Sequence, residues 1–377
     1  MAPDKLRPSD PRATHHTADI RGKTYHYILS EPVGAYQATV LLVHGWPDLH
    51  LGWRYVVPYL TTLGLRVVVP DMVGYGGTDA PEPLEAYSLK SVAADLAALA
   101  ELTAPGEQVV LGGHDWGGLA VWRAAQWHPG LVRAVFSVCT PYFPPSQTYV
   151  DLNTQAAVLP NFTYQIQLAG PDVEREVAGE ARLRSFIHGF FGGRGPAGEL
   201  VFENTRGVLL ENLDKLGKSP LIDDEEAEFY VREYSRHGCM HLCPSVLPSP
   251  GEFWESQTRA PLPLQHKASA NPGGAVRGPL NWYRTRKVNF DEERALLADG
   301  GPPRFAMPAL MLSASGDSTL PPRLTEGMDR HFDDLTRAVI PGNHWVLLGP
   351  WAEAANAEIG KFLKRVLADD KTPKASI

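Results

Sequence analysis

An acidic residue stands at the centre of a glycine-rich break in this sequence. An apolar run at Val109–Leu111 leads into Gly112-Gly113-His114-Asp115-Trp116-Gly117-Gly118, and a helical pattern resumes from Leu119 to His128. Small residues on both sides of Asp115 are typical of a strained strand-to-helix turn that presents one side chain above a sheet. Serine commonly occupies that position. An aspartate is already ionised near neutral pH, so Asp115 can attack a tetrahedral carbon without a base and form an alkyl ester.

Hydrolysis of such an ester requires an activated water, and two later residues fit that task. Asp317 follows an apolar run at Leu310–Ala314, and His344 follows another at Arg337–Ile340. The order nucleophile, acid, histidine is that of hydrolases with this turn. Both residues come just after a predicted strand, where open α/β sheets place their ligand sites. We expect His344 to act as the general base and Asp317 to orient it and stabilise its imidazolium.

The strand and helix patterns predict an α/β fold that brings these residues together. Runs of β-branched and apolar residues predict strands, and runs with helical spacing lie between them. This alternation is typical of a mostly parallel central sheet with helices on both faces. Strands are predicted at 25–29, 39–43, 65–70, 109–111, 131–139, 308–313 and 337–340, and helices at 53–63, 88–102, 119–128, 326–331 and 352–366.

The alternation stops near Phe143 and returns near residue 301, which predicts a core interrupted by a helical cap. Within the cap, one long stretch is rich in proline, serine and glycine and has neither helical nor strand periodicity, so we expect an irregular insertion there. The predicted units are a polar tail at 1–20, a discontinuous core at 21–142 and 301–368, a cap at 143–300 with the insertion at 239–276, and a tail at 369–377.

The composition is that of a soluble globular enzyme. The chain has 377 residues, of which 44% are hydrophobic and 21% charged, with a net charge of −8. This acidic balance argues against a nucleic-acid partner. No apolar run approaches the roughly 20 residues of a membrane helix, no signal peptide or peroxisomal address is visible, and the three cysteines form no disulfide framework. We therefore expect a cytoplasmic protein without a membrane span.

Two further clusters of polar residues are assigned structural roles. His237, Cys239, His241 and Cys243 are metal-ligand types, but their spacing is not that of a zinc site, so no metal is predicted there. Asp223-Asp224-Glu225-Glu226 is predicted to form the solvated first turn of a cap helix, where the helix dipole favours acidic residues.

Three motifs together resemble the epoxide hydrolases of the α/β-hydrolase superfamily. The resemblance covers about residues 21–238 and 277–368 and implies an α/β-hydrolase fold with an inserted helical cap. The motifs are His44-Gly45-Trp46-Pro47, the loop with Asp71, Gly74, Gly76 and Thr78, and Gly113-His114-Asp115-Trp116-Gly117-Gly118.

The resemblance also implies further site residues. In that family the backbone N–H groups after His-Gly and after the nucleophile form an oxyanion hole, and these belong here to Trp46 and Trp116. Two cap tyrosines protonate the epoxide oxygen. Tyr283 lies in an Asn-Trp-Tyr-Arg signature, and Tyr164 lies in the looser motif Phe-Thr-Tyr-Gln. Tyr75, Tyr142 and Tyr149 are weaker rivals for this role.

The residues and the resemblance together predict an epoxide hydrolase. The expected substrates are an epoxide and water, the product is a vicinal diol, and the intermediate is a covalent hydroxyalkyl-aspartyl ester on Asp115. Neither a metal nor an organic cofactor is expected. A haloalkane or haloacid dehalogenase of the same superfamily is the nearest alternative, and a non-catalytic small-molecule receptor on this fold is a more remote one. The sequence leaves the substrate and the oligomeric state open.

Overall fold

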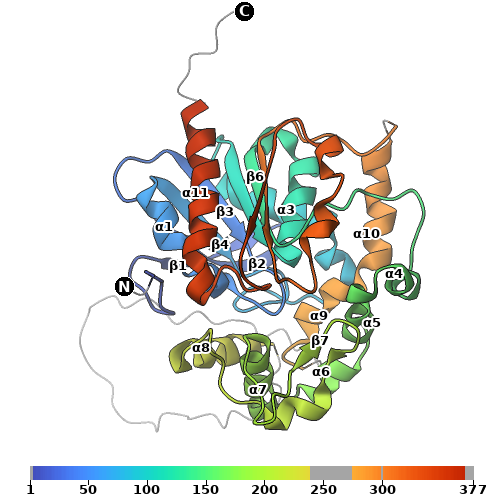
Figure 1. Cartoon of the computed structure of the whole chain (residues 1–377). Helices are drawn as coiled ribbons and strands as arrows, with labels where there is room; N and C mark the ends of the chain where they lie inside the picture. Colours follow the sequence, from blue (N-terminus) through green and yellow to red (C-terminus); the bar gives the residue numbers. More distant parts are fainter. Residues whose placement is uncertain (1–2, 238–273, 299, 370–377) are drawn as a thin grey trace, which may run out of the picture.

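The molecule is built around one large sheet. The computed structural model describes residues 3–237, 274–298 and 300–369. The strands of the sheet are β1 Thr14–Ile20, β2 Lys23–Ser30, β3 Ala38–Val43, β4 Leu65–Pro70, β5 Val109–His114, β6 Val132–Val138, β9 Ala309–Ala314 and β10 Leu335–Ile340. They follow the order β1-β2-β4-β3-β5-β6-β9-β10 (Figure 1). β1, β2 and β4 pair antiparallel, and the strands from β4 to β10 pair parallel. The predicted mostly parallel sheet is confirmed.

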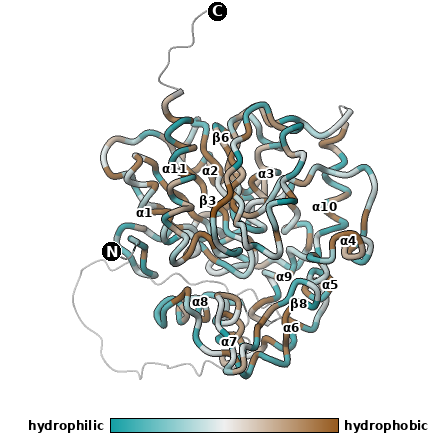
Figure 2. Tube along the Cα trace, in the orientation of Figure 1, coloured by the Kyte–Doolittle hydropathy of each residue, from teal (hydrophilic) through white to brown (hydrophobic). Residues whose placement is uncertain are grey.

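Helices cover both faces of the sheet because its central strands are apolar on both sides. Every residue of β3, β5 and β9 is buried. α1 Val57–Thr62 and α11 Ala352–Asp369 lie on one side of the sheet in Figure 1, and α2 Leu89–Thr103 and α3 Trp116–Trp127 pack together on the other. Figure 2 shows hydrophobic residues concentrated in the central strands, whereas hydrophobic and hydrophilic residues alternate along the surrounding helices.

Most of the segment between β6 and β9 lies below the sheet in Figure 1, whereas its two ends, α4 Leu152–Val158 and α10 Arg286–Glu293, lie beside the core, where α10 contacts α2. The segment is mainly helical, as predicted, but it also contains a short antiparallel pair of strands that the sequence analysis missed. Its other elements are α5 Tyr164–Ala169, α6 Asp172–Glu176, α7 Glu180–Phe190, β7 Phe202–Glu203, β8 Gly207–Val208, α8 Asp224–Ser235 and α9 Arg277–Arg284.

Short 3-10 helices replace parts of two predicted α-helices. The region predicted as one helix over 53–63 divides into a 3-10 turn and the shorter α1, and 326–331 contains only a 3-10 turn. The 3-10 segments are η1 His50–Trp53, η2 Leu84–Tyr87, η3 Pro129–Leu131, η4 Pro160–Phe162, η5 Leu210–Lys215, η6 Arg294–Leu297, η7 Pro322–Thr325, η8 Met328–His331 and η9 Gly349–Trp351.

The prediction of a polar tail over residues 1–20 is wrong. Residues Thr14–Ile20 form β1, whose backbone pairs with β2 along its whole length. Leu6 is buried, and its N–H donates to the carbonyl of Arg54 at 2.8 Å. The sequence analysis missed this strand because nearly all of its side chains are exposed, so no alternation of apolar and polar residues marks it.

The acidic run at 223–226 starts a cap helix as predicted, but it is not fully solvated. Asp223 caps α8, and a capping box joins it to Glu226. Glu226 itself is buried, and its carboxylate pairs with Arg54 and Lys5 at 2.7 Å each. This acid therefore joins the cap to the core, which periodicity alone does not reveal.

Some sequence-based expectations lie outside the described residues. These are most of the predicted insertion at 239–276, the residues 239, 241 and 243 of the metal-ligand cluster, and nearly all of the tail at 369–377. Among the helices that the structure does describe, none has the length and apolarity needed to cross a lipid bilayer.

Candidate active site

Asp115 sits on a strained turn between β5 and α3. It is the N-cap residue of α3 and has a φ of +52°, which is unfavourable for a residue with a side chain. The glycines around it are required by close backbone contacts. A Cβ on Gly113 would lie 2.2 Å from the carbonyl oxygen of Gly117, and one on Gly117 would lie 2.0 Å from the carbonyl oxygen of Val43. The turn therefore places the Asp115 carboxylate above the sheet, as the glycine pattern predicts.

The loop after β3 approaches the same carboxylate. The backbone N–H of Trp46 donates to Asp115 Oδ1 at 2.7 Å. A Cβ on Gly45 would lie 2.3 Å from that oxygen, so only glycine permits this approach. His44 orients the loop, because its Nδ1 bonds to the Gly45 carbonyl and its Nε2 accepts from the N–H of Met72, both at 2.9 Å. Burial lowers the pKa of His44 to about 4, which keeps this ring neutral.

The charge on Asp115 is balanced by neighbouring donors. Burial raises the pKa of Asp115, while His344 and hydrogen bonds from the backbone N–H groups of Trp46 and Trp116 lower it. The net shift is upward from the usual range. The two N–H groups expected to form an oxyanion hole therefore both act on this carboxylate.

His344 lies between two carboxylates. Its Nδ1 bonds to Asp317 Oδ2 at 2.8 Å, and its Nε2 lies 3.6 Å from Asp115 Oδ2. Burial alone would lower the pKa of His344, but Asp317 and Asp115 raise it to about 9. Burial alone would raise the pKa of Asp317, but His344 and the N–H groups of the acid's own loop lower it to about 2. The structure thus brings together three residues that are far apart in the sequence.

The backbone carbonyl of His344 is held by two residues that the sequence analysis did not single out. His114 Nε2 lies 2.9 Å from this oxygen, and Cys139 Sγ lies 3.6 Å from it. Burial lowers the pKa of His114 to about 3, so its ring is neutral and donates through Nε2–H. His114 stands next to the nucleophile in the glycine motif, and this adjacency was the available signal for its role.

Tyr164 and Tyr283 face this triad from the cap. Tyr164 begins α5 and Tyr283 lies near the end of α9, and their ring centroids are 6.1 Å apart. Both side chains are buried, which raises both pKa values, and nearby Asp115 raises them further. The ring of Tyr283 packs edge-on against Trp46 and Trp116. Both phenols therefore stay protonated and can donate hydrogen bonds at neutral pH.

The other residues of the Asn-Trp-Tyr-Arg signature anchor α9. Trp282 Nε1 donates to the carbonyl of Val73 at 3.0 Å, and Arg284 pairs with Glu174 at 3.0 Å. The signature therefore contains one side chain that faces the triad and neighbours that fix the helix on the core and on α6.

One cavity of 270 Å³ joins the core and cap residues. The rival tyrosines Tyr75, Tyr142 and Tyr149 are not part of the described lining: Tyr75 and Tyr142 are buried elsewhere, and Tyr149 lines a neighbouring cavity. The expected residues in the lining are Trp46, Asp115, Tyr164, Tyr283 and His344, with an aromatic and apolar wall that includes Phe190, Leu200, Val201 and Phe202.

A chain of hydrogen bonds ties the acid loop to the cap. The N–H of Thr319 donates to Asp317 Oδ1 at 2.9 Å, and its hydroxyl donates to Asn204 Oδ1 at 2.8 Å. The carbonyl of Asn204 accepts from the N–H of Tyr164 at 2.9 Å. No sequence motif marks Thr319 or Asn204, because their contact depends on how the cap docks.

Comparisons with known proteins identify related sequences. The sequence profile of the α/β hydrolase fold matches residues 38–183. Epoxide hydrolase srdG of Neurospora crassa is 39% identical over 97% of this chain and 100% of its own length. Bifunctional epoxide hydrolase 2 of Rattus norvegicus is 28% identical over 86% of this chain, which spans 51% of that relative.

Solved structures give the same result for the fold. Epoxide hydrolase A from Mycobacterium thermoresistibile is similar with a TM-score of 0.66 and 25% identity over 93% of this chain and 98% of that one. Epoxide hydrolase VrEH1 from Vigna radiata has a TM-score of 0.70 over 95% of this chain and 100% of that one, at 21% identity, and therefore shows the shared fold alone.

Proposed function

The chain belongs to the epoxide hydrolase family of the α/β-hydrolase fold, and we propose that it converts epoxides to vicinal diols through a covalent ester on Asp115. One observation carries the proposal. A buried carboxylate with a backbone donor on one oxygen and His344 3.6 Å from the other faces two protonated phenols across a single cavity. A nucleophile on one side and proton donors on the other are what opening of a three-membered ether ring requires.

In the first step, Asp115 attacks an epoxide carbon. The oxygen that carries no hydrogen bond from Trp46 is Oδ2, which makes it the better nucleophile. As the new C–O bond forms, the ring C–O bond breaks and its electrons go to the epoxide oxygen. Tyr164 and Tyr283 hold that oxygen, and one of them gives it a proton. Their raised pKa values do not prevent this transfer, because an alkoxide is far more basic than a phenolate.

In the second step, His344 removes a proton from water, which attacks the carbonyl carbon of the Asp115 ester. The negative charge that develops on the carbonyl oxygen is stabilised by the N–H groups of Trp46 and Trp116, each typically worth about 3 kcal/mol in the transition state. Collapse of the tetrahedral intermediate releases the diol, and the proton on His344 goes to the leaving oxygen. The second proton of the water stays on the regenerated Asp115 carboxyl and returns to the tyrosinate formed in the first step, which restores the enzyme. Asp317 stabilises the imidazolium throughout.

The proposed route predicts where oxygen from water goes. In a single turnover with enzyme in excess in heavy-oxygen water, the label enters the Asp115 carboxylate, and the first diol carries an unlabelled oxygen from the enzyme. Mass spectrometry of the peptide that contains Asp115 measures this. A labelled diol with an unlabelled peptide would instead show direct attack of water on the epoxide and would overturn the covalent route.

The dehalogenase alternative is tested with the same protein. The phenol pair is suited to an epoxide oxygen, which takes up a proton, and a departing halide needs no proton. Styrene oxide hydrolysis without halide release from 1-chlorobutane or chloroacetate is the expected result. Halide release without diol formation would reverse the assignment.

A further inference from the structure

A second cavity, of 300 Å³, meets the catalytic cavity at the cap tyrosines. Tyr283 lines both cavities. Trp116, whose backbone N–H acts on the nucleophile, also lines the second one. So does Gln165, whose side-chain amide donates to the Tyr164 hydroxyl at 3.5 Å. An epoxide held by the two phenols can therefore extend one arm into this second cavity.

The second cavity has mainly apolar walls and contains one excess positive charge. Aromatic side chains such as Phe143 and Phe162 form much of the lining, and the charged residues in it are Arg123, Glu293 and Arg286. Arg123 and Glu293 form a buried bidentate pair, in which Nε donates to Oε1 at 2.8 Å and Nη2 donates to Oε2 at 3.0 Å. These two charges compensate each other, so the charge of Arg286 remains.

Arg286 bonds only to neutral acceptors. Its Nε donates to the carbonyl of Val150, and its Nη1 donates to Gln155 Oε1 at 2.7 Å. Among the residues that the structure describes, none offers Nη2 an acceptor, and no carboxylate pairs with this guanidinium. The carboxylate of Asp151, on the neighbouring segment, is engaged as the N-cap of α4. Two N–H groups on Nη2 are therefore available to a ligand.

The position of Arg286 is unfavourable for an unpaired cation. The side chain is half-buried, and burial lowers the pKa of the guanidinium although Tyr149 and Asp151 act in the opposite direction. Arg286 is also the first residue of α10, where the helix dipole disfavours a positive charge and the first turn contains no acidic residue. The group is protonated nevertheless, because a guanidinium does not lose its proton in proteins. A local arrangement that costs stability in this way is typical of a functional position.

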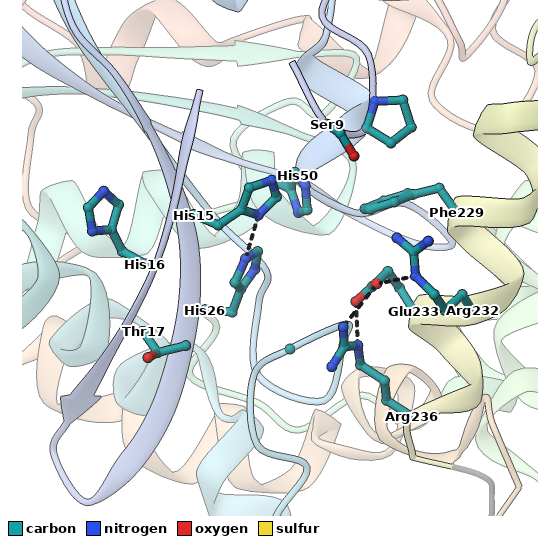
Figure 3. A pocket seen from close by; sticks show the side chains of 12 residues that line it. Ser9, His15, His16, Thr17, His26, His50, Phe229, Arg232, Glu233 and Arg236 are labelled. Atoms are coloured by element: carbon teal, nitrogen blue, oxygen red, sulfur yellow. Dashed lines mark hydrogen bonds and ion pairs between the residues drawn. The ribbon is translucent and has the colours of Figure 1, made fainter. Parts of the chain in front are cut away.

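The arginines of another cavity show the more usual arrangement. Arg232 and Arg236 line a cavity of 340 Å³ beside α8. Both bond to Glu233 (Figure 3), with a distance of 3.0 Å from Arg232 Nε to Glu233 Oε1. These two arginines share one carboxylate, but each has an anionic partner within the protein. Arg286 differs from them because its anionic partner is not supplied by the described part of the chain.

We propose that Arg286 binds an acidic group of the substrate, so that the preferred epoxides carry a carboxylate at the end of one arm. This inference rests on the proposed function and adds a specificity-determining residue to it. Hydrogen bonds from a guanidinium to a carboxylate are roughly twice as strong as bonds between neutral groups. The apolar walls suit the hydrocarbon chain that joins the epoxide ring, held at Tyr283, to the acid at Arg286.

Paired substrates test the role of Arg286. In a series of straight-chain epoxy acids, the chain between the ring and the carboxylate lengthens by one methylene at a time, and each acid is compared with its uncharged primary amide. We expect the wild type to hydrolyse the best acid with a kcat/KM roughly tenfold or more above that of its amide, mainly through a lower KM. Arg286→Gln should abolish this ratio, and Arg286→Lys should retain part of it. The ratio is the readout because a disturbed fold would lower both rates together.

Lys287→Gln is the matched control for charge. Lys287 follows Arg286 in α10, but its ammonium is exposed and pairs with Asp291. We expect the ratio of acid to amide to stay within about twofold of the wild type, because exposed ion pairs contribute little. Arg194 is exposed beside the catalytic cavity and is the rival anchor. A ratio that falls in Arg194→Gln and persists in Arg286→Gln would overturn the assignment.

Binding without turnover separates this inference from the proposed function. Saturated acids and amides of the same chain lengths contain no epoxide, and calorimetry measures their affinities. We expect the wild type to bind the acid more tightly and Arg286→Gln to bind the acid and the amide equally. A protein that shows this preference but hydrolyses no epoxide would contradict the proposed function alone. Equal affinity and equal turnover of acids and amides by an active wild type would refute the role of Arg286 alone.

Discussion

The two halves of the active site are positioned in different ways. Asp115, Asp317 and His344 follow β5, β9 and β10, and each is fixed by hydrogen bonds to backbone atoms or to one another. Tyr164 and Tyr283 lie on α5 and α9, which have 6 and 8 residues. Helices this short are not stable alone, so these tyrosines depend on how the cap packs on the core.

This difference in support coincides with a difference in chemistry. The core half holds the nucleophile and the groups that hydrolyse the ester, and the cap half holds the groups that receive the epoxide oxygen. If the proposed mechanism is right, substitutions in the two halves stop the reaction at different steps. The amount of covalent ester that accumulates is the measurement that separates them.

The largest effect is expected in the core half, from His344→Gln. Without a base for water, turnover should fall by ~10⁴-fold or more, a range typical of the loss of a catalytic triad member. Asp115 remains able to open the ring, so intact-mass analysis should show one equivalent of substrate attached to the enzyme. Asp115→Ala is the control and should show neither turnover nor adduct. An unmodified His344→Gln protein after incubation with substrate would contradict the division of labour.

Substitutions in the cap half should slow an earlier step, the opening of the epoxide ring. We expect Tyr283→Phe to slow ring opening by ~10²-fold, and Tyr164→Phe/Tyr283→Phe by ~10³-fold or more, because a proton donor commonly contributes 10²–10⁴-fold. Stopped-flow tryptophan fluorescence follows this step, and no ester should accumulate in either variant. Tyr75→Phe is the matched control, since the Tyr75 hydroxyl is buried without a hydrogen-bond partner in the described part of the chain. Its rate should remain within about threefold of the wild type, given the small cost of removing an unbonded hydroxyl.

The core half was also the half that the sequence predicted best. Parallel strands bring their carboxyl ends to one edge, so the order of predicted strands is enough to place Asp115, Asp317 and His344 close together. The cap tyrosines were assigned only through a family resemblance, since a tyrosine in a short helix has no local mark of function. The link from Thr319 to Asn204 and the buried pairing of Glu226 had no signal in the sequence, because both depend on docking of the cap. β1 was missed because its side chains are exposed.

The pH dependence of ester decay tests whether the charge on Asp115 controls the pKa of His344. In the resting enzyme the pKa of His344 is about 9, partly because the negative charge of Asp115 stabilises the imidazolium. Ester formation removes that charge, and loss of a nearby negative charge lowers the pKa of a cation. The rate of ester decay in a single turnover should therefore rise with pH through an apparent pKa below 9 and then level off. One pH unit below that pKa, the rate of ester decay should be about tenfold lower than its plateau value at high pH, as expected for a single base.

Two comparisons give this experiment its controls. NMR titration of His344 in the resting wild type should give the higher pKa, and Tyr164→Phe should leave the pKa of ester decay unchanged because it alters only the cap half. Asp317→Asn should lower both values, since Asp317 is the main group that raises the pKa of His344. An ester-decay pKa equal to the resting value would show that the charge on Asp115 does not control the base.

The smallest effect is expected where the two halves touch. Thr319 contacts Asp317 through its backbone N–H and Asn204 through its hydroxyl, so Thr319→Val removes the bond to Asn204 alone. The backbone bonds of residue 319 remain, including the one that its carbonyl accepts from Asn161 in the cap at 2.6 Å. Loss of one such hydrogen bond typically costs ~0.5–1.5 kcal/mol, which corresponds to ~2–12-fold in rate. We expect this loss in ring opening, because Asn204 supports the backbone of Tyr164, while ester decay stays unchanged. Thr319→Ser retains the hydroxyl and should restore the wild-type rate. Slower ester decay in Thr319→Val would instead show that loss of the bond to Asn204 disturbs Asp317. The cap half would then influence the core half, although the two are held in place by different contacts.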